Sequence, residues 1–244
     1  MEKKLHIKTR DGKHTIFGTL NTPKRKTDKL VIFVHGLTGH QNEHIFYNAV
    51  PRFTKQGIAT FRFNLYSWEK DARRLRNATI LQHAKDLERV AEHFKKQYEH
   101  LGAVGHSFGG LTVLFSDTTL FDALVLWDPS WETASWIRKT KYVKELDAYI
   151  LDWGVEHLLG KPMYTERTEE RINPVQLAAT IMQPLKVICA GKGVLKKGGR
   201  AYFRAAKGPK IYTVIEGADH TFDEEGTEEK LHRETLQWMK RHLR

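Results

Sequence analysis

One serine of this 244-residue chain stands in a sequence that could expose it for nucleophilic attack. Residues 105–109 read Gly-His-Ser-Phe-Gly, so a glycine lies two positions before and two positions after Ser107. An apolar run precedes the motif and a helical pattern follows it, and G-x-S-x-G in that context forms a sharp turn that projects the serine hydroxyl. Glycines are needed there because larger side chains would clash. The motif predicts Ser107 as a nucleophile, and a chance glycine-rich turn is the alternative.

A base must accompany such a serine, because its hydroxyl is a weak nucleophile at neutral pH. His220 fits this role, since it lies in the loop GADHTF between the last predicted strand and the last predicted helix. The base that serves a serine on this kind of turn comes late in the chain. Most other histidines lie on predicted helix faces or near the termini, where packing or solvated roles are expected. We therefore predict His220 as the base and expect His106 to pack beside the nucleophile.

Acyl transfer also needs two backbone N–H groups directed at the developing oxyanion. One is expected at Phe108, directly after the serine and at a helix N-terminus, whose dipole adds positive potential. The second is expected at Leu37, within the stretch HGLTG that follows the first central strand. His35 in the same stretch is expected to brace the loop.

The elements that position these groups follow from hydrophobic spacing. Continuous apolar runs predict strands that are buried on both faces, and apolar positions three and four residues apart predict helices. A turn signal at Asp11 and Gly12 predicts an antiparallel hairpin at the start of the chain. The predicted strands are 5–10, 14–20, 29–36, 58–65, 100–107, 122–128, 185–191 and 211–217, and the predicted helices are 42–56, 79–97, 109–117, 199–206 and 227–242. This alternation predicts an α/β fold with a mainly parallel sheet and helices on both faces.

Residues 130–183 interrupt the alternation. They are rich in Trp and charged residues, and their spacing indicates helical segments and no strand. We therefore expect an α/β core made of residues 1–129 and 184–244, with 130–183 as a small helical cap over the C-terminal edge of the sheet, where open α/β sheets bind ligands.

Four stretches in this order and spacing, HGLTG, FRFNLY, GHSFGG and GADHTF, resemble the α/β-hydrolase family over nearly the whole chain. The closest resemblance is to small esterases related to cinnamoyl and feruloyl esterases. It implies an eight-stranded sheet and a Ser–Asp–His triad without a metal or organic cofactor. It also assigns the nucleophile to Ser107, the base to His220 and the oxyanion amides to Leu37 and Phe108.

The acid of the triad departs from the family pattern. Relatives carry G-x-x-D after the strand that matches 185–191, whereas this chain has Val194 at the place of the acid. Some family members place the acid after the preceding strand, which here ends at Asp128. Asp128 is therefore the candidate that orients His220 and stabilises its imidazolium.

Three alternatives to this assignment remain open. Asp128 could serve as a helix cap or a turn residue before Pro129. Asp219 is a rival acid, although it is adjacent to His220 and adjacent side chains rarely face each other. The triad could also lack its acid and turn over slowly, because some catalysis survives from the base and the oxyanion amides.

The residues of the insertion bear on the substrate. Their aromatic side chains suit the lining of an apolar pocket, although several are expected simply to pack the insertion onto the sheet. Basic residues there could admit an anionic group. The aromatic residues are Trp131, Trp136, Tyr142, Tyr149, Trp153 and Tyr164, and the basic ones are Arg138, Lys139 and Lys141.

Carboxylic esters with an aromatic or medium apolar acyl group are the expected small-molecule substrates. The same constellation would serve a thioesterase, an acylglycerol lipase or a peptidase that acts on short chains. A hypothesis of another class is a non-catalytic binding protein on a hydrolase scaffold, motivated by the missing acid at Val194. The sequence leaves the natural substrate and the oligomeric state open.

Composition sets the remaining expectations. The formal net charge is +11, but the basic residues are scattered in short groups, which favours solvated surface charge over specific nucleic-acid binding. No stretch approaches the roughly 20 apolar residues of a membrane span, and the N-terminus is charged where a signal peptide is apolar, so a cytoplasmic location is expected. The single cysteine, Cys189, lies in an apolar run and is expected to be a buried structural thiol.

Overall fold

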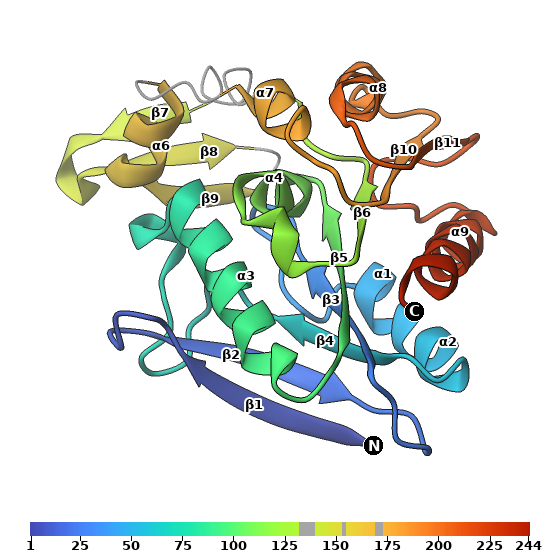
Figure 1. Cartoon of the computed structure of the whole chain (residues 1–244). Helices are drawn as coiled ribbons and strands as arrows, with labels where there is room; N and C mark the ends of the chain where they lie inside the picture. Colours follow the sequence, from blue (N-terminus) through green and yellow to red (C-terminus); the bar gives the residue numbers. More distant parts are fainter. Residues whose placement is uncertain (132–139, 153–154, 169–172) are drawn as a thin grey trace.

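The computed structural model describes residues 1–131, 140–152, 155–168 and 173–244. An eight-stranded sheet crosses the molecule in the order β1-β2-β4-β3-β5-β6-β10-β11 (Figure 1). Its strands are β1 (Glu2–Lys8), β2 (Thr15–Asn21), β3 (Lys29–Val34), β4 (Ala59–Phe63), β5 (His100–His106), β6 (Ala123–Trp127), β10 (Leu185–Ala190) and β11 (Lys210–Ile215). The predicted eight-stranded sheet is confirmed.

Strand direction follows the sequence patterns. The pairs β1–β2 and β2–β4 are antiparallel, and all pairs from β4 to β11 are parallel. The predicted N-terminal hairpin is therefore confirmed, and its turn contains Gly12 at a φ of 69°, which glycine adopts without strain. The central strands are buried along nearly their whole length because helices cover both faces, which explains their continuous apolar runs.

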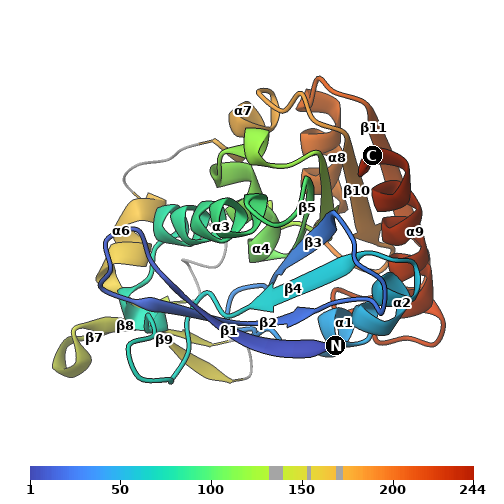
Figure 2. The same cartoon turned by 60° about the horizontal axis from the view of Figure 1, so that its bottom comes forward.

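Helices cover the two faces unequally (Figure 2). One face carries α1 (His44–Tyr47), α2 (Ala49–Lys55) and α9 (Thr227–His242), whose apolar side chains share one core cluster. The other face carries α3 (Ile80–Lys95), α4 (Phe108–Phe115), α7 (Pro174–Ala178) and α8 (Lys196–Ala205), which share the larger cluster. The short 3₁₀ segments η1 (Leu75–Asn77) and η2 (Thr118–Leu120) flank α3 and α4 in the chain. The predicted helices are found, except that 42–56 forms two helices and α8 begins earlier than expected.

The segment between β6 and β10 corrects one prediction. It was expected to be helical without strands, yet it contains an antiparallel sheet of β7 (Thr140–Val143), β8 (Ala148–Asp152) and β9 (Glu156–Gly160), followed by the helices α6 (Lys161–Thr168) and α7. A 3₁₀ segment, η3 (Lys144–Leu146), and Asp147 at a φ of 46° form the first turn. Tyr142 and Tyr149 stand directly opposite each other on β7 and β8, with ring centroids 5.2 Å apart. Such cross-strand aromatic pairs stabilise strands of four or five residues, which are too short to be recognised by spacing alone.

Several contacts join this segment to the rest of the fold, among them one hydrogen-bonded and one close backbone contact. Glu166 on α6 accepts hydrogen bonds from the N–H groups of Ile80 (2.6 Å) and Leu81 (3.0 Å), the first residues of α3. At the end of β9, a side chain on Gly160 would overlap the carbonyl oxygen of Arg76. The carboxylate satisfies N–H groups that a helix N-terminus leaves unpaired, so the segment is hydrogen-bonded to the core and not merely laid on it.

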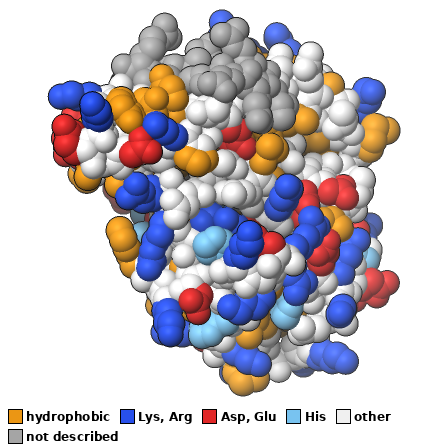
Figure 3. All heavy atoms as spheres, turned by 90° about the vertical axis from the view of Figure 1, so that its left-hand side faces the viewer, with side chains coloured by type: hydrophobic (Ala, Val, Ile, Leu, Met, Phe, Trp, Pro, Cys, Tyr) orange, Lys and Arg blue, Asp and Glu red, His pale blue; other side chains and the backbone are white. Residues whose placement is uncertain are grey.

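Positive charge is dispersed over one face of the molecule. On the face that contains β7 and the β1–β2 turn, Lys and Arg side chains alternate with acidic and histidine side chains (Figure 3). In the described parts of the chain, no helix has the length and apolar character of a membrane span.

Candidate active site

Ser107 lies on a strained turn between β5 and α4. Its backbone has φ 54° and ψ −118°, a region that L-residues rarely adopt. A Cβ atom on Gly105 would lie 2.3 Å from the carbonyl oxygen of Gly109, and one on Gly109 would lie 2.2 Å from the carbonyl oxygen of Val34. The two glycines of the motif are therefore required by backbone contacts, as predicted. The turn presents the hydroxyl of Ser107 at the C-terminal edge of the sheet.

A chain of hydrogen bonds links three side chains at this edge. His220 Nε2 lies 2.9 Å from Ser107 Oγ, and His220 Nδ1 lies 2.6 Å from Asp128 Oδ2. The imidazole can therefore accept the serine proton while its Nδ1–H donates to the carboxylate. The neighbouring His106 donates from Nε2 to the carbonyl oxygen of His220 at 2.9 Å, and burial lowers the pKa of His106 to about 3. His106 thus packs as a neutral ring beside the nucleophile and holds the histidine loop.

Asp128 is held rigidly at the end of β6. It is fully buried, its N–H donates to the carbonyl oxygen of Ile188 at 2.7 Å, and its Oδ1 accepts the N–H of Ala190 at 3.1 Å. Both carboxylate oxygens are therefore engaged, one by strand β10 and one by His220. At the position where relatives carry the acid, the side chain of Val194 is 91% exposed.

Asp219, the rival acid, has a different role in the loop. Its Oδ1 accepts the N–H groups of Thr221 at 3.0 Å and of Asp223 at 3.3 Å. These bonds shape the turn that carries His220.

The loop after β3 supplies the second side of the site. The Cα of Gly36 packs against Ser107, because a Cβ there would lie 3.2 Å from the serine Cβ. Among the residues that the structure describes, neither the N–H of Leu37 nor that of Phe108 has a hydrogen-bond partner. His35 Nδ1 donates to the carbonyl oxygen of Gly36 at 2.7 Å, and its Nε2 accepts the N–H of Leu65 at 3.0 Å. His35 therefore braces this loop as expected, and burial lowers its pKa to about 4.

Two residues of the site escaped the sequence analysis. Ser130 Oγ lies 3.4 Å from Ser107 Oγ. Ser130 could have been found from the sequence, because it stands two residues after the candidate Asp128. The carboxyl group of Glu43 packs against Gly39 in the loop after β3, and its Oε2 is buried without a partner among the described residues. Burial raises the pKa of Glu43 to about 7. The sequence around Glu43 indicates only the start of a helix, so it gave no signal.

A cavity of about 640 Å³ adjoins the loop after β3. It lies between that loop, the segment after β4 and strand β9 of the insertion. Apolar and aromatic side chains such as Tyr66, Trp68, Leu75 and Leu158 line it together with Arg74, Arg76 and two histidines, His40 and His157. This composition is typical of pockets that bind small, largely apolar molecules.

Among the described aromatic residues of the insertion, the tyrosines pack on one another and Trp131 packs on helix α8. Tyr149 stacks on Tyr164 with ring centroids 3.8 Å apart, and Trp131 contacts Tyr202 at 5.9 Å. Packing contacts are therefore found for Trp131, Tyr142, Tyr149 and Tyr164, as expected for several residues of this set. Trp136, Trp153, Arg138 and Lys139 lie outside the described residues, and Lys141 is exposed on β7.

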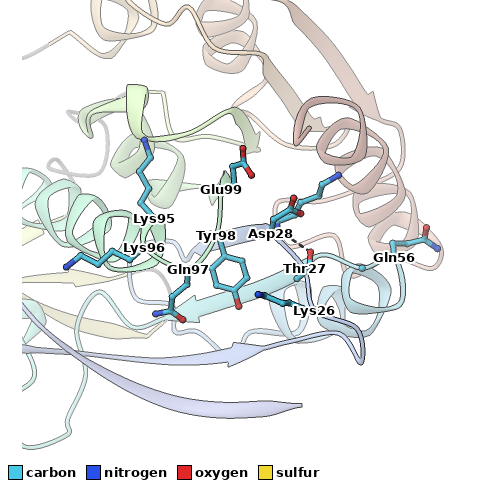
Figure 4. A pocket seen from close by; sticks show the side chains of 11 residues that line it. Lys26, Thr27, Asp28, Gln56, Lys95, Lys96, Gln97, Tyr98 and Glu99 are labelled. Atoms are coloured by element: carbon cyan, nitrogen blue, oxygen red, sulfur yellow. Dashed lines mark hydrogen bonds between the residues drawn. The ribbon is translucent and has the colours of Figure 1, made fainter.

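A larger hollow of about 870 Å³ lies at the other end of the strands (Figure 4). Lys26, Lys95 and Lys96 line it together with polar residues that precede β3 and β5. Ligand atoms of Asp28, Glu99 and His100 lie within 4.8 Å of one another nearby. The lysines disfavour a cation in this region, and Ser107 follows the opposite end of β5.

Comparisons with known proteins identify the family and agree with the fold. The model of the alpha/beta hydrolase family matches residues 31–229, whereas no curated protein matches the chain. Est1E from Butyrivibrio proteoclasticus, solved with ferulic acid bound, is 20% identical with a TM-score of 0.81, and the match covers 98% of each chain. The esterase domain of a Rhodothermus marinus protein is 19% identical with a TM-score of 0.78 over the whole of both chains. The Pyrococcus furiosus esterase Pf2001 is 18% identical with a TM-score of 0.74, over 100% of this chain and 93% of that one.

Proposed function

Because this chain belongs to the alpha/beta hydrolase family, we propose that it is a serine hydrolase that cleaves carboxylic esters. Ser107 is the nucleophile, His220 the general base and Asp128 the acid. The observation that carries the proposal is the continuous pair of hydrogen bonds from Asp128 through His220 to Ser107, of 2.6 and 2.9 Å. A nucleophile within reach of a base that a third group orients is the arrangement that activates a serine.

The reaction proceeds through an acyl-enzyme. His220 Nε2 takes the proton of Ser107 as Oγ attacks the ester carbonyl, and the N–H groups of Leu37 and Phe108 stabilise the oxyanion. The buried carboxylate of Asp128 stabilises the imidazolium. His220 then gives its proton to the departing alkoxide, and water releases the acyl group by the same steps in reverse order.

The acyl group occupies the cavity of about 640 Å³ beside the loop after β3. This cavity lies on the side of Leu37, and its lining by Tyr66, Trp68 and Leu158 suits an aromatic or medium apolar acyl group. Strand β9 contributes part of that lining, which supports a role of residues 130–183 as a cap on the core. The structural similarity to a ferulic-acid complex fits this assignment of the substrate class.

The test combines labelling with turnover. A fluorophosphonate probe should label the native protein and not Ser107→Ala, since the probe requires an activated serine. A p-nitrophenyl ester series of increasing acyl length should be hydrolysed by the native protein. The acyl length with the highest kcat/KM then indicates the size of the acyl cavity. A native protein that neither reacts with the probe nor shows a burst with any ester would overturn the proposal in favour of a binding protein on this scaffold.

A further inference from the structure

A second hollow, along helix α8 and the edge strand β11, is strongly cationic. It measures about 540 Å³ and lies between Trp131, helix α8 and strand β11. Four positively charged side chains of α8 line it, against one carboxylate, that of Glu216. The four are Lys196, Lys197, Arg200 and Arg204.

These cations form no ion pairs with the described part of the chain. Among the residues that the structure describes, none of the four has a carboxylate oxygen within 4.0 Å. Lys196 donates to the carbonyl oxygen of Gly191, and the guanidinium of Arg200 lies over the ring of Tyr212 at 5.3 Å. Lys197 and Arg204 are exposed. The hollow therefore offers two oriented and two free cations to a ligand.

The arrangement is unfavourable for the helix alone. Lys196, Arg200 and Arg204 follow one another at four-residue spacing, so like charges lie on one face and repel. Lys196 and Lys197 also begin α8, where the helix dipole disfavours positive charge. A bound anion would relieve both effects.

Residues next to the hollow lie close to the catalytic groups. Trp131 directly follows Ser130, whose hydroxyl lies 3.4 Å from that of Ser107. On the other side, Glu216 packs against Gly191, and a Cβ on Gly193 would lie 3.1 Å from Asp128 Oδ2. The cations therefore lie on the side of Asp128 and His220, opposite the apolar cavity beside Leu37.

The position of the hollow relative to His220 determines which part of a substrate lies near these cations. His220 protonates the leaving oxygen, so the alcohol portion of an ester must depart on the side of His220. We propose that the hollow binds an anionic group, a carboxylate or phosphate, on the alcohol portion of the ester substrate. This inference rests on the proposed function and names its substrate class as esters of anionic alcohols. It adds no covalent step, since the anion is held by charge and hydrogen bonds.

The experiment compares esters that differ in leaving-group charge. The substrates are 4-butyryloxybenzoate, 4-butyryloxyphenyl phosphate and the neutral 4-butyryloxy-N-methylbenzamide. Their kcat/KM values are measured for the native protein and for Lys197→Gln/Arg204→Gln, which removes two exposed charges. Taking the ratio of variant to native for each ester cancels differences in leaving-group reactivity.

A matched control removes the same charge elsewhere. Lys95→Gln/Lys96→Gln changes two lysines beside the hollow at the opposite end of the strands (Figure 4). It lowers the net charge equally, so it reports any general effect of charge on the attraction of anions.

We expect Lys197→Gln/Arg204→Gln to lower kcat/KM for both anionic esters by about tenfold, mainly through KM, and to leave the neutral ester unchanged. The control variant should leave all three esters unchanged. Raising the salt concentration to about 0.5 M should reduce the native preference for the anions. A loss for the benzoate alone identifies a carboxylate site, and a loss for the phosphate alone identifies a phosphate site.

Equal losses for charged and neutral esters, or equal effects of the two double variants, would overturn the inference while leaving ester hydrolysis intact. If no ester is hydrolysed, the proposed function fails by itself. The hollow is then judged by calorimetric binding of 4-hydroxyphenyl phosphate, which should weaken in Lys197→Gln/Arg204→Gln. Equal affinities of the native and variant proteins for this phosphate would show that the hollow is not an anion site.

Discussion

The carboxylate of Asp128 reaches His220 from strand β6, with Oδ2 2.6 Å from Nδ1, while its other oxygen is held by the N–H of Ala190 on β10. The carboxylate is therefore bonded to a neighbouring strand as well as to His220. The loop after β10 does not supply the carboxylate, and Val194 projects into solvent there.

Asp128→Asn should abolish most of the activity. Ala190 N–H needs an acceptor, so the amide oxygen will take the place of Oδ1 and the NH₂ group will face His220 Nδ1. The imidazole must then carry its proton on Nε2 and cannot accept the proton of Ser107. We expect kcat to fall by about 10⁴-fold in a p-nitrophenyl ester assay. Asp219→Asn is the control, with less than about a tenfold effect expected, and the reverse ranking would identify Asp219 as the acid.

Gly109→Ala should destabilise the fold as well as the site. The new Cβ would lie 2.2 Å from the carbonyl oxygen of Val34 and 2.6 Å from that of His35, and backbone atoms cannot move aside cheaply. We expect a loss of about 3 kcal/mol in the free energy of unfolding, measured by urea denaturation. Gly57→Ala is the matched control, because its φ is 78° but nothing lies within 4 Å, so only backbone strain of about 1 kcal/mol applies. Similar losses in both variants would contradict the packing argument.

Glu43→Gln should make thermal stability less dependent on pH. Burial raises the pKa of Glu43 from 4.5 to about 7 in the folded protein, so folding favours the protonated form. The contribution of Glu43 to the free energy of unfolding is therefore fully present below pH 4.5. It is lost as the pH rises through about 7, and the loss is at most on the order of 3 kcal/mol. The variant should melt several degrees above the native protein at about pH 8 and at the same temperature at about pH 4.

The control for Glu43 is Glu225→Gln, which removes an exposed carboxylate. It should follow the native melting temperature across the same pH range. A melting temperature of Glu43→Gln that parallels the native curve at every pH would show that the carboxyl is not buried as described.

Glu166→Ala should loosen the start of α3. The carboxylate accepts the N–H groups of Ile80 and Leu81, and charged hydrogen bonds of this kind contribute about 1.5–3 kcal/mol. Hydrogen exchange at these two amides should accelerate, and the free energy of unfolding should decrease by about 2 kcal/mol. Thr79→Ala provides the comparison, because its hydroxyl caps Gln82 at 3.1 Å and is expected to contribute about 1 kcal/mol. Unchanged exchange at residues 80 and 81 in Glu166→Ala would show that the insertion does not cap α3.

The parts of the fold that sequence could predict are those with strong local signals. The central strands are continuous apolar runs because both faces of the sheet are covered, and α3 and α9 have regular apolar spacing over 16 residues each. Ser107 and His220 could be placed because each stands at a recognisable junction of strand and helix. Asp128 could be predicted only from the family resemblance, because some members place the acid after the strand that matches β6.

The remainder depends on contacts between distant segments. Strands β7, β8 and β9 have four or five residues each, and their stability comes from cross-strand pairs and contact with η1 rather than from their own pattern. The environment of Glu43 depends on how the loop after β3 folds back upon it. The cationic hollow depends on α8 lying beside Trp131, which is 65 positions before Lys196 in the chain, so no local pattern could reveal it.

The place of Asp128 directly after β6 ties two of the three side chains to the sheet and leaves the third on a loop. Ser107 and Asp128 follow adjacent strands, and the N–H of Ser107 donates to the carbonyl oxygen of Trp127 at 2.9 Å, so these two groups move as one body. His220 instead lies in a loop bounded by Gly217 and Gly226, both in left-handed conformations with φ of 81° and 74°. Loss of alignment on heating should therefore begin as a displacement of the loop that carries His220, while Ser107 and Asp128 keep their relative positions. If the proposed triad is correct, inactivation should precede melting of the sheet.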